Sequence, residues 1–302
     1  PLRVIILLLL ALSILILDDL ADGDWGRLTG GWGNMVTFWN ESLWPPDWSV
    51  LEAQSYPQCE SEVGFFCSKA YLGMVETLKI AFVSTILGFA LVIGFSPLAA
   101  RNLTRPSVAI PIRIFLSALR SLPSLIWAII FVIVIGFGPL SGVLAMTIYT
   151  VGYLGKLQYE HMEGLQNDPL EAARAMGLSH FEISTHIVIP ESANSLLSQM
   201  MFMFEYNVRH GTVIGIVGAG GIGYYINTYM KFLYYDKVLA LLIVIFVVVL
   251  AIDLLSMFIR SFVTEEGDVK RPSWSTILFS PNRAATHHHG EDKEAENTSD
   301  QH

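Results

Sequence analysis

The sequence has 302 residues, of which 53% are hydrophobic and only 15% charged, with a mean hydropathy of +0.51 and a formal net charge of −9. This balance excludes an ordinary soluble domain and indicates a chain that needs a lipid bilayer. The acidic balance also gives no reason to expect a nucleic-acid partner.

Long apolar segments recur along the chain, and a bilayer core of about 30 Å is crossed by roughly 20 apolar residues in a helix. We therefore predict an all-α polytopic membrane protein with six transmembrane helices. The predicted spans are 2–17, 71–98, 111–137, 141–159, 186–205 with a glycine-rich continuation, and 238–262.

Residues 1–17 have the length of a signal-peptide core, but no clear cleavage site of small residues follows them. We interpret this segment as an uncleaved transmembrane anchor, with a cleaved signal peptide as the alternative. Because the chain starts at Pro1, we also expect further residues before it.

The placement of basic residues predicts the topology. Arg101, Arg105 and Arg113 lie in a connection without acidic residues, whereas 18–62 carries nine acidic residues and one arginine. Lys and Arg concentrate on the cytoplasmic side. We expect a multi-pass protein of the bacterial plasma membrane, with both termini cytoplasmic and residues 18–70 outside.

The predicted outer segment, 18–70, contains both cysteines of the chain, Cys59 and Cys67. An oxidising compartment would allow them to form a disulfide, and two unpaired thiols are the alternative. The same segment is rich in tryptophan, which suits either anchoring at the membrane interface or contact with an outer partner.

Residues 263–302 form an acidic tail that we predict to be cytoplasmic and disordered. Three consecutive histidines, 287–289, lie within it. In a polar, low-complexity segment such a run is more often solvated than bound to metal, so we predict no metal site.

Residues 71–262 form the predicted core, and its most informative segment is a loop at about 167–190. Asp168 can cap a helix that starts at Pro169, with Glu171 in the capping-box position. Gly177 can end that helix in the left-handed conformation.

The second half of the loop repeats this pattern. Ser179 and Glu182 have the spacing of another capping box, and Pro190 suits the first turn of the next span. The loop is therefore predicted to form a helix-turn-helix on the cytoplasmic face.

A stiff element between two spans can transmit force from an external motor. The small Ala172 and Ala173 leave room for a partner groove, and Glu171 offers a charge at its rim. We predict a coupling helix here, and an incidental surface helix is the alternative.

The loop resembles the permease subunits of ABC importers. Their pattern is Glu-Ala-Ala, three residues, Gly, nine residues, Ile, one residue and Leu-Pro. The matching residues are Glu171, Ala172, Ala173, Gly177, Ile187 and Pro190, with Ile189 in place of the leucine. The resemblance implies a separate ATPase dimer that binds ATP and Mg, a second permease subunit, identical or related, and a binding protein outside.

Further segments are similar to the phosphonate-type permeases of this family. They are 98–103, 120–128, 152–157 and 207–223. This likeness implies transport of phosphonates or similar anions such as phosphite and phosphate. Segments 18–70 and 263–302 match less well and receive no role from it.

The stretch 218–223 has the spacing of a dinucleotide-binding loop, but membrane spans on both sides exclude that fold. Glycines within a span instead permit a bend or close helix contact, as expected of a gate or pathway lining. The candidate pathway residues are Asn207, Arg209, Thr212, Gly218, Gly220, Gly221 and Gly223.

Glu205 and Arg209 are four residues apart and can pair on one helix face. Their pairing would neutralise both charges, whereas the alternative is that Arg209 adds positive potential along an anion pathway. Elsewhere Glu76 and Lys79 can neutralise each other and Asp253 can serve helix packing, so we assign these three no substrate role.

The sequence contains no Gly-x-x-x-x-Gly-Lys-Ser/Thr loop and no set of catalytic residues in the spans. We therefore predict a transport subunit without a cofactor of its own. The alternatives are an ABC permease for another small solute, or an ATP-independent channel or secondary transporter.

Overall fold

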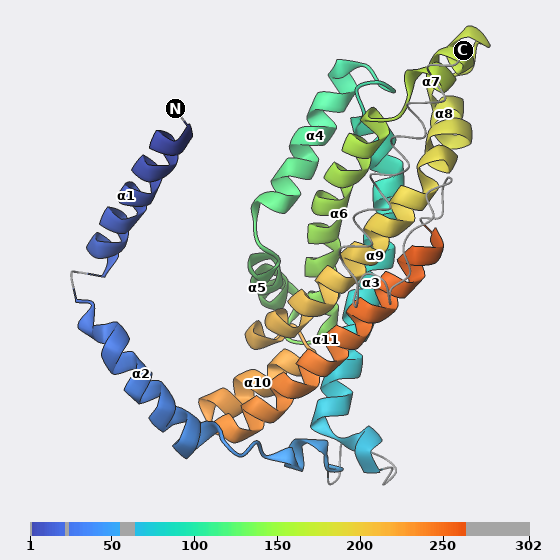
Figure 1. Ribbon diagram of the computed structural model, residues 1–302. Helices are drawn as coiled ribbons and strands as arrows, with labels where there is room; N and C mark the ends of the chain where they lie inside the picture. Colours follow the sequence, from blue (N-terminus) through green and yellow to red (C-terminus); the bar gives the residue numbers. More distant parts are fainter. Residues whose placement is uncertain (1, 22–23, 55–63, 264–302) are drawn as a thin grey trace, which may run out of the picture. The chain divides into compact units, whose positions relative to one another are not determined.

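The computed structural model describes residues 2–21, 24–54 and 64–263 (Figure 1). Apart from one isolated β-bridge between Ala53 and Ser68, these residues form helices and their connections. The all-α prediction is confirmed. Residues 1–262 are one compact unit, and of the second unit, 263–302, only Val263 is described.

The helices follow one another without intervening strands in the described residues. The α-helices are α1 (Leu2–Leu20), α2 (Gly26–Phe38), α3 (Lys69–Ala99), α4 (Pro106–Ser121), α5 (Ser124–Ile135), α6 (Pro139–Glu163), α7 (Asn167–Ala175), α8 (His180–Ile183), α9 (Ile189–Ile214), α10 (Ile222–Lys231) and α11 (Tyr235–Val263). Short π- or 3-10 segments are η1 (Trp39–Leu43), η2 (Trp48–Leu51), η3 (Gly64–Cys67), η4 (Ser184–Val188) and η5 (Gly215–Val217).

The helix pair α3 and α6 forms the centre of the bundle, with the most extensive contact of any two elements. Glycine permits this approach, because a Cβ on Gly88 of α3 would lie 2.4 Å from the side chain of Thr150 in α6. On its other side α6 packs against α4, where a Cβ on Gly155 of α6 would lie 2.9 Å from the side chain of Leu116 in α4. Small residues at such contacts are typical of helices packed within membranes.

The helix α11 covers another side of the bundle. Its Leu241 is fully buried in a cluster with Met74 of α3 and Ile222 of α10. The remainder of α11 presents large apolar side chains such as Phe246 and Phe258 at its surface. Such a surface suits lipid and not water.

Three helices of the described residues, α3, α6 and α11, are long and apolar enough to cross a membrane. The pair α4 and α5 adds a fourth if counted as one span, although its two halves are bent by 83°. The span predicted over 111–137 is therefore broken and is not one continuous helix. Pro123 has no N–H to continue the helix and keeps Leu122 extended.

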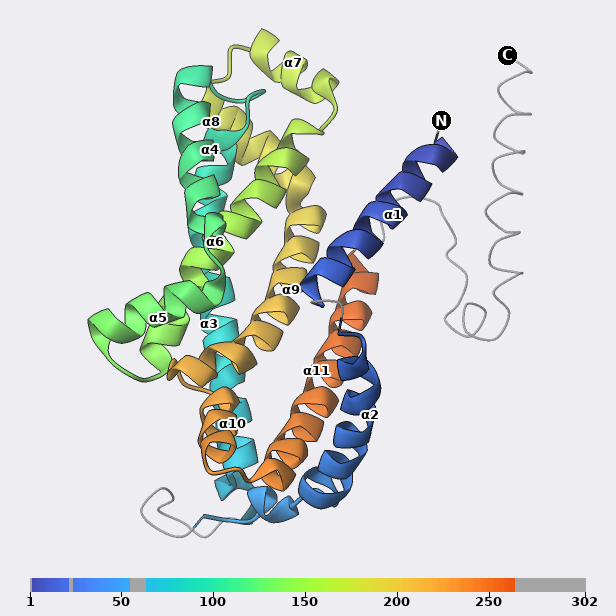
Figure 2. The same ribbon diagram turned by 90° about the vertical axis from the view of Figure 1, so that its left-hand side faces the viewer.

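The short helix α7 lies at one end of the bundle and α10 at the opposite end, in both Figure 1 and Figure 2.

Candidate functional site

The helix α7 forms the first half of the predicted helix-turn-helix. It begins at Asn167, after Gln166, whose side chain makes no capping hydrogen bond. The prediction that Asp168 caps a helix starting at Pro169 is therefore wrong. Pro169 falls in the first turn, where the backbone N–H that proline lacks would have no helical acceptor. The negative charge of the Asp168 carboxylate interacts favourably with the positive N-terminal end of the helix dipole.

Gly177 ends α7, as predicted. Its φ is +79°, and its N–H donates to the carbonyl of Arg174 at 3.0 Å. The N–H of Leu178 donates to the carbonyl of Ala173 at 3.2 Å. These two bonds are the Schellman pattern, which satisfies the last carbonyls of the helix.

The helix α8 begins with the predicted capping box. The N–H of Glu182 donates to Ser179 Oγ at 3.3 Å, and the N–H of Ser179 donates to Glu182 Oε2 at 2.8 Å. The hydrogen bonds from the side chain and backbone of Ser179 lower the pKa of the Glu182 carboxyl. The turn between α7 and α8 is thus fixed at both edges.

The second helix is not separate from the span that follows. The π segment η4 joins α8 to α9, with the N–H of Ile189 bonded to the carbonyl of Ser184. Pro190 lies in the first turn of α9, as predicted, directly after this wider turn. A wider turn before proline relieves the contact of its ring with the preceding backbone.

The two faces of α7 differ in burial. Leu170 and Ala173 are buried against the bundle, whereas Glu171 and Ala172 are exposed. Of the predicted small pair, only Ala172 faces outward. Two exposed apolar side chains that we did not predict lie beside this face, Met176 directly after α7 and Phe181 in α8, at 71% and 76% exposure.

A hydrogen-bond network connects α7 to the bundle. Arg174 Nη2 donates to the carbonyl of Asn102 at 2.5 Å, and Asn102 Nδ2 donates to the carbonyl of Met162 at 2.9 Å. Glu163 at the end of α6 forms an ion pair with Arg113. From the sequence we assigned Arg113 only to the cytoplasmic side, because none of these partners is near it in the chain.

Asn207 of α9 is fully buried, and its Nδ2 donates to Thr85 Oγ1 of α3 at 2.8 Å and to Thr150 Oγ1 of α6 at 2.9 Å. One amide therefore connects three helices. Asn207 was predicted to line the pathway, and that role stays a prediction.

Arg209 faces α11. Its Nη2 lies 2.6 Å from both carboxylate oxygens of Asp253 and 3.8 Å from Glu205 Oε2. The predicted pairing of Glu205 with Arg209 is confirmed, but Glu205 makes its shorter ion pair with Arg260 of α11. The charges of α9 are thus compensated across the α9–α11 contact, and Asp253 does serve helix packing.

The predicted glycine residues form a sharp turn between α9 and α10. Gly218, Gly220 and Gly221 all have positive φ, from +79° to +89°. A Cβ on Gly223 would lie 2.0 Å from the carbonyl oxygen of Thr212, so the chain folds back closely on α9. Whether this turn serves as a gate stays a prediction.

Glu76 and Lys79 of α3 line a groove of about 550 Å³ together with Tyr225 of α10. No ion pair joins the two side chains in the described part of the chain. The prediction that they neutralise each other is therefore wrong.

The predicted disulfide falls partly outside the described residues. Cys67 is buried at the end of η3, whereas Cys59 lies in the segment 55–63, which is not described. The pairing stays a prediction. The acidic tail and its three histidines also lie outside the described residues.

The chain is similar to one family of membrane transport proteins. The profile of the "Binding-protein-dependent transport system inner membrane component" matches residues 91–264. The phosphite transport system permease protein PtxC of Stutzerimonas stutzeri is 35% identical over 77% of this chain and 79% of its own length.

Two further matches differ in their coverage. The phosphate-import permease protein PhnE of Mycolicibacterium smegmatis is 38% identical over 63% of this chain, but the chain spans only 36% of that protein. A chain of the MetNI methionine ABC transporter, solved in inward-facing conformations, has a TM-score of 0.55 and 25% identity over 64% of this chain and 95% of its own.

Proposed function

The chain belongs to the family of binding-protein-dependent transport system inner membrane components, and we propose that it forms the pathway of an ATP-driven importer for phosphorus oxyanions. Two relatives named as permeases for phosphate and phosphite support this substrate class. Phosphonates share the same charged oxygen groups and belong to it as well.

The proposal includes partners and an orientation. A second permease copy, identical or related, completes the pathway, and an outer binding protein delivers the substrate. A separate ATPase dimer holds ATP and Mg and docks on α7. This places α7, the acidic tail and both termini in the cytoplasm, in agreement with the arginines of the connection between α3 and α4.

The exposed face of α7 carries the proposal. Glu171 and Ala172 face outward from α7. Hydrogen bonds fix the C-terminal end of this helix, the turn that follows it and its connection to the bundle. The adjoining Met176 and Phe181 supply exposed apolar area. A small surface that combines a charge with apolar area, on a rigid support, suits the docking of a partner that transmits force to the bundle.

The test is to substitute Glu171→Ala and to co-purify the ATPase with the permease. We expect the co-purified ATPase to fall several-fold and ATP-dependent uptake of phosphite to fall with it, while membrane insertion is unchanged. Glu41→Ala, an exposed glutamate of η1, serves as the matched control. Wild-type uptake that persists without ATP, or that prefers a substrate without phosphorus, would contradict the proposal.

A further inference from the structure

A polar cleft of about 370 Å³ opens where α4 bends into α5. Its polar lining residues are Arg120, Ser121, Ser124, Tyr149, Tyr206 and His210. The volume equals on the order of ten water molecules. A small oxyanion therefore fits with part of its hydration.

The charge of Arg120 has no acidic partner. Its side chain donates to Ser117 Oγ at 3.3 Å, and no carboxylate lies within ion-pair distance of it in the described residues. Arg113, Arg209 and Arg260, by contrast, each pair with a carboxylate. A guanidinium stays charged, so inside a helix bundle it requires water or an anion.

The position of Arg120 is fixed by the packing of the bend. A Cβ on Gly152 of α6 would lie 2.8 Å from the backbone nitrogen of Arg120. Trp127 Nε1 donates to the carbonyl of Leu119 at 3.0 Å, which ties α5 to the end of α4. The backbone from which the Arg120 side chain extends is therefore fixed beside the cleft.

Three aromatic side chains supply further hydrogen-bonding groups. The hydroxyls of Tyr149 and Tyr206 lie 2.8 Å apart, so one donates to the other and the second proton remains for a ligand. His210 stacks on Tyr206 with ring centroids 3.8 Å apart. Its Nδ1 lies 3.1 Å from the Tyr206 carbonyl, which can only accept, so Nδ1 carries the proton of the neutral ring. Nε2 is then an acceptor, which can take a hydrogen bond from a protonated oxygen of the oxyanion.

The start of α5 adds a weak positive potential. Ser124 and Leu125 line the cleft as the first residues of this helix. The first N–H groups of a helix lack helical acceptors and favour an anion. Among the described residues, no acidic side chain lines the cleft.

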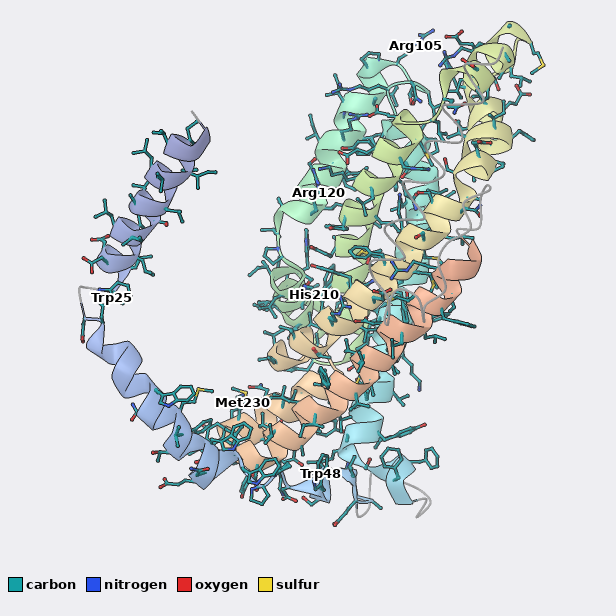
Figure 3. The ribbon with its side chains drawn as sticks, in the orientation of Figure 1. Trp25, Trp48, Arg105, Arg120, His210 and Met230 are labelled. Atoms are coloured by element: carbon teal, nitrogen blue, oxygen red, sulfur yellow. The ribbon has the colours of Figure 1, made fainter. Side chains whose placement is uncertain are left out.

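The cleft lies part-way through the bundle. Figure 3 shows Arg120 and His210 between Arg105, near the α7 end, and Trp48, toward the other end. An anion that crosses the bundle would pass this depth. Arg209, by comparison, is compensated by Asp253 on the side that faces α11.

We infer that this cleft is a transient binding site for a phosphorus oxyanion, with Arg120 as the principal cation. The hydrogen-bonded pair Tyr149 and Tyr206 supplies one orienting donor, and His210 Nε2 accepts from a protonated oxygen of the ligand. The inference rests on the proposed function and deepens it. A lipid headgroup has the same phosphate chemistry, so the experiment must separate a free oxyanion from a lipid.

The first measurement is transport per ATP hydrolysed in proteoliposomes that contain the whole complex and its binding protein. We expect Arg120→Gln to lower it about tenfold, since the hydrogen bonds of a guanidinium to an oxyanion are charge-assisted. Arg120→Lys keeps the charge and should recover part of the loss. Arg105→Gln, at the other end of the same helix, is the matched control and should transport normally.

The second measurement reports occupancy directly. Ser121 is exposed at the cleft, so Ser121→Cys offers a thiol whose rate of modification is compared with that of the unsubstituted chain. In nanodiscs of neutral lipid, we expect inorganic phosphate or phosphite to slow modification at least about threefold, and to lose this effect in Ser121→Cys/Arg120→Gln.

The outcomes separate the two proposals. If free oxyanion has no effect on modification and Arg120→Gln transports normally, the site is overturned while the proposed function stands. If only anionic lipid slows modification, the cleft holds a headgroup and the substrate site is likewise overturned. If the wild type imports no phosphorus oxyanion, the proposed function fails, whatever the thiol reports.

Discussion

Gly177 has a backbone conformation that a side chain would strain. Its φ of +79° lies in the left-handed region, although a Cβ there would meet no atom within 4 Å. Gly177→Ala therefore adds conformational strain of about 1 kcal/mol without a steric clash. We expect faster hydrogen exchange at the end of α7 and a several-fold loss of co-purified ATPase.

A second glycine in the same loop provides the control for this prediction. Gly164 ends α6 with φ −83°, which alanine adopts readily, and its nearest neighbour would lie 3.4 Å from a Cβ. Gly164→Ala should leave both hydrogen exchange and co-purification unchanged. An equal effect of the two substitutions would show that the left-handed conformation is not the cause.

The contact between α9 and α11 depends on compensated charges. Removing Arg209 by Arg209→Met leaves Asp253 without its closest partner, and an unpaired charge at membrane depth is costly. We expect a loss of about 1–2 kcal/mol in stability, because both side chains are partly exposed. Arg209→Met with Asp253→Leu should recover most of it, as measured by thermal unfolding in detergent.

An ion pair within one helix is the matched control. Lys156 and Glu160 lie 3.4 Å apart on α6 and are 37% and 50% exposed. Such pairs contribute at most a few tenths of a kcal/mol, so Lys156→Met should hardly change the unfolding temperature. Failure of the double substitution to recover stability would mean that Arg209 acts through packing and not through charge.

If α7 transmits force to the bundle, it must move together with the helices against which it packs. Arg174 provides that connection, because its bond to the Asn102 carbonyl joins α7 to the connection between α3 and α4. We expect Arg174→Ala to lower substrate transported per ATP hydrolysed about threefold or more, by loss of a charged hydrogen bond, while the ATPase still co-purifies.

Arg101 allows a matched comparison, since it lies in the same connection and its side chain is exposed. The hydrogen bond that Arg101 makes to α6 comes from its backbone, whose N–H donates to Glu163 Oε1 at 2.7 Å. Arg101→Ala removes the same charge and keeps that bond, so the ratio of transport to hydrolysis should be unchanged. Equal loss in both variants would assign the effect to local charge.

Features governed by a few neighbouring residues could be predicted well. The end of α7 at Gly177 and the capping box of Ser179 and Glu182 are confirmed, because each depends on the conformation or hydrogen bonds of residues within one turn. The start of α7 was misplaced, since several residues near Asp168 are acceptable first positions and local chemistry does not choose between them.

Features that join distant parts of the chain were missed. The partner of Arg209 is 44 residues away and that of Arg113 is 50 residues away. The bend between α4 and α5 was likewise missed, because the residues on the two sides of Pro123 are together apolar enough for one span.

Composition and local motifs thus predict a helical membrane protein with a capped helix-turn-helix, and the resemblance that this motif carries predicts the permease family that the profile match shows. Which charges are compensated, and that Arg120 is left in a cleft, follows only from the packing of the helices. The physical reason is that caps and turns are stabilised within a few residues, whereas the energy of a charge inside a bundle depends on groups that folding brings beside it.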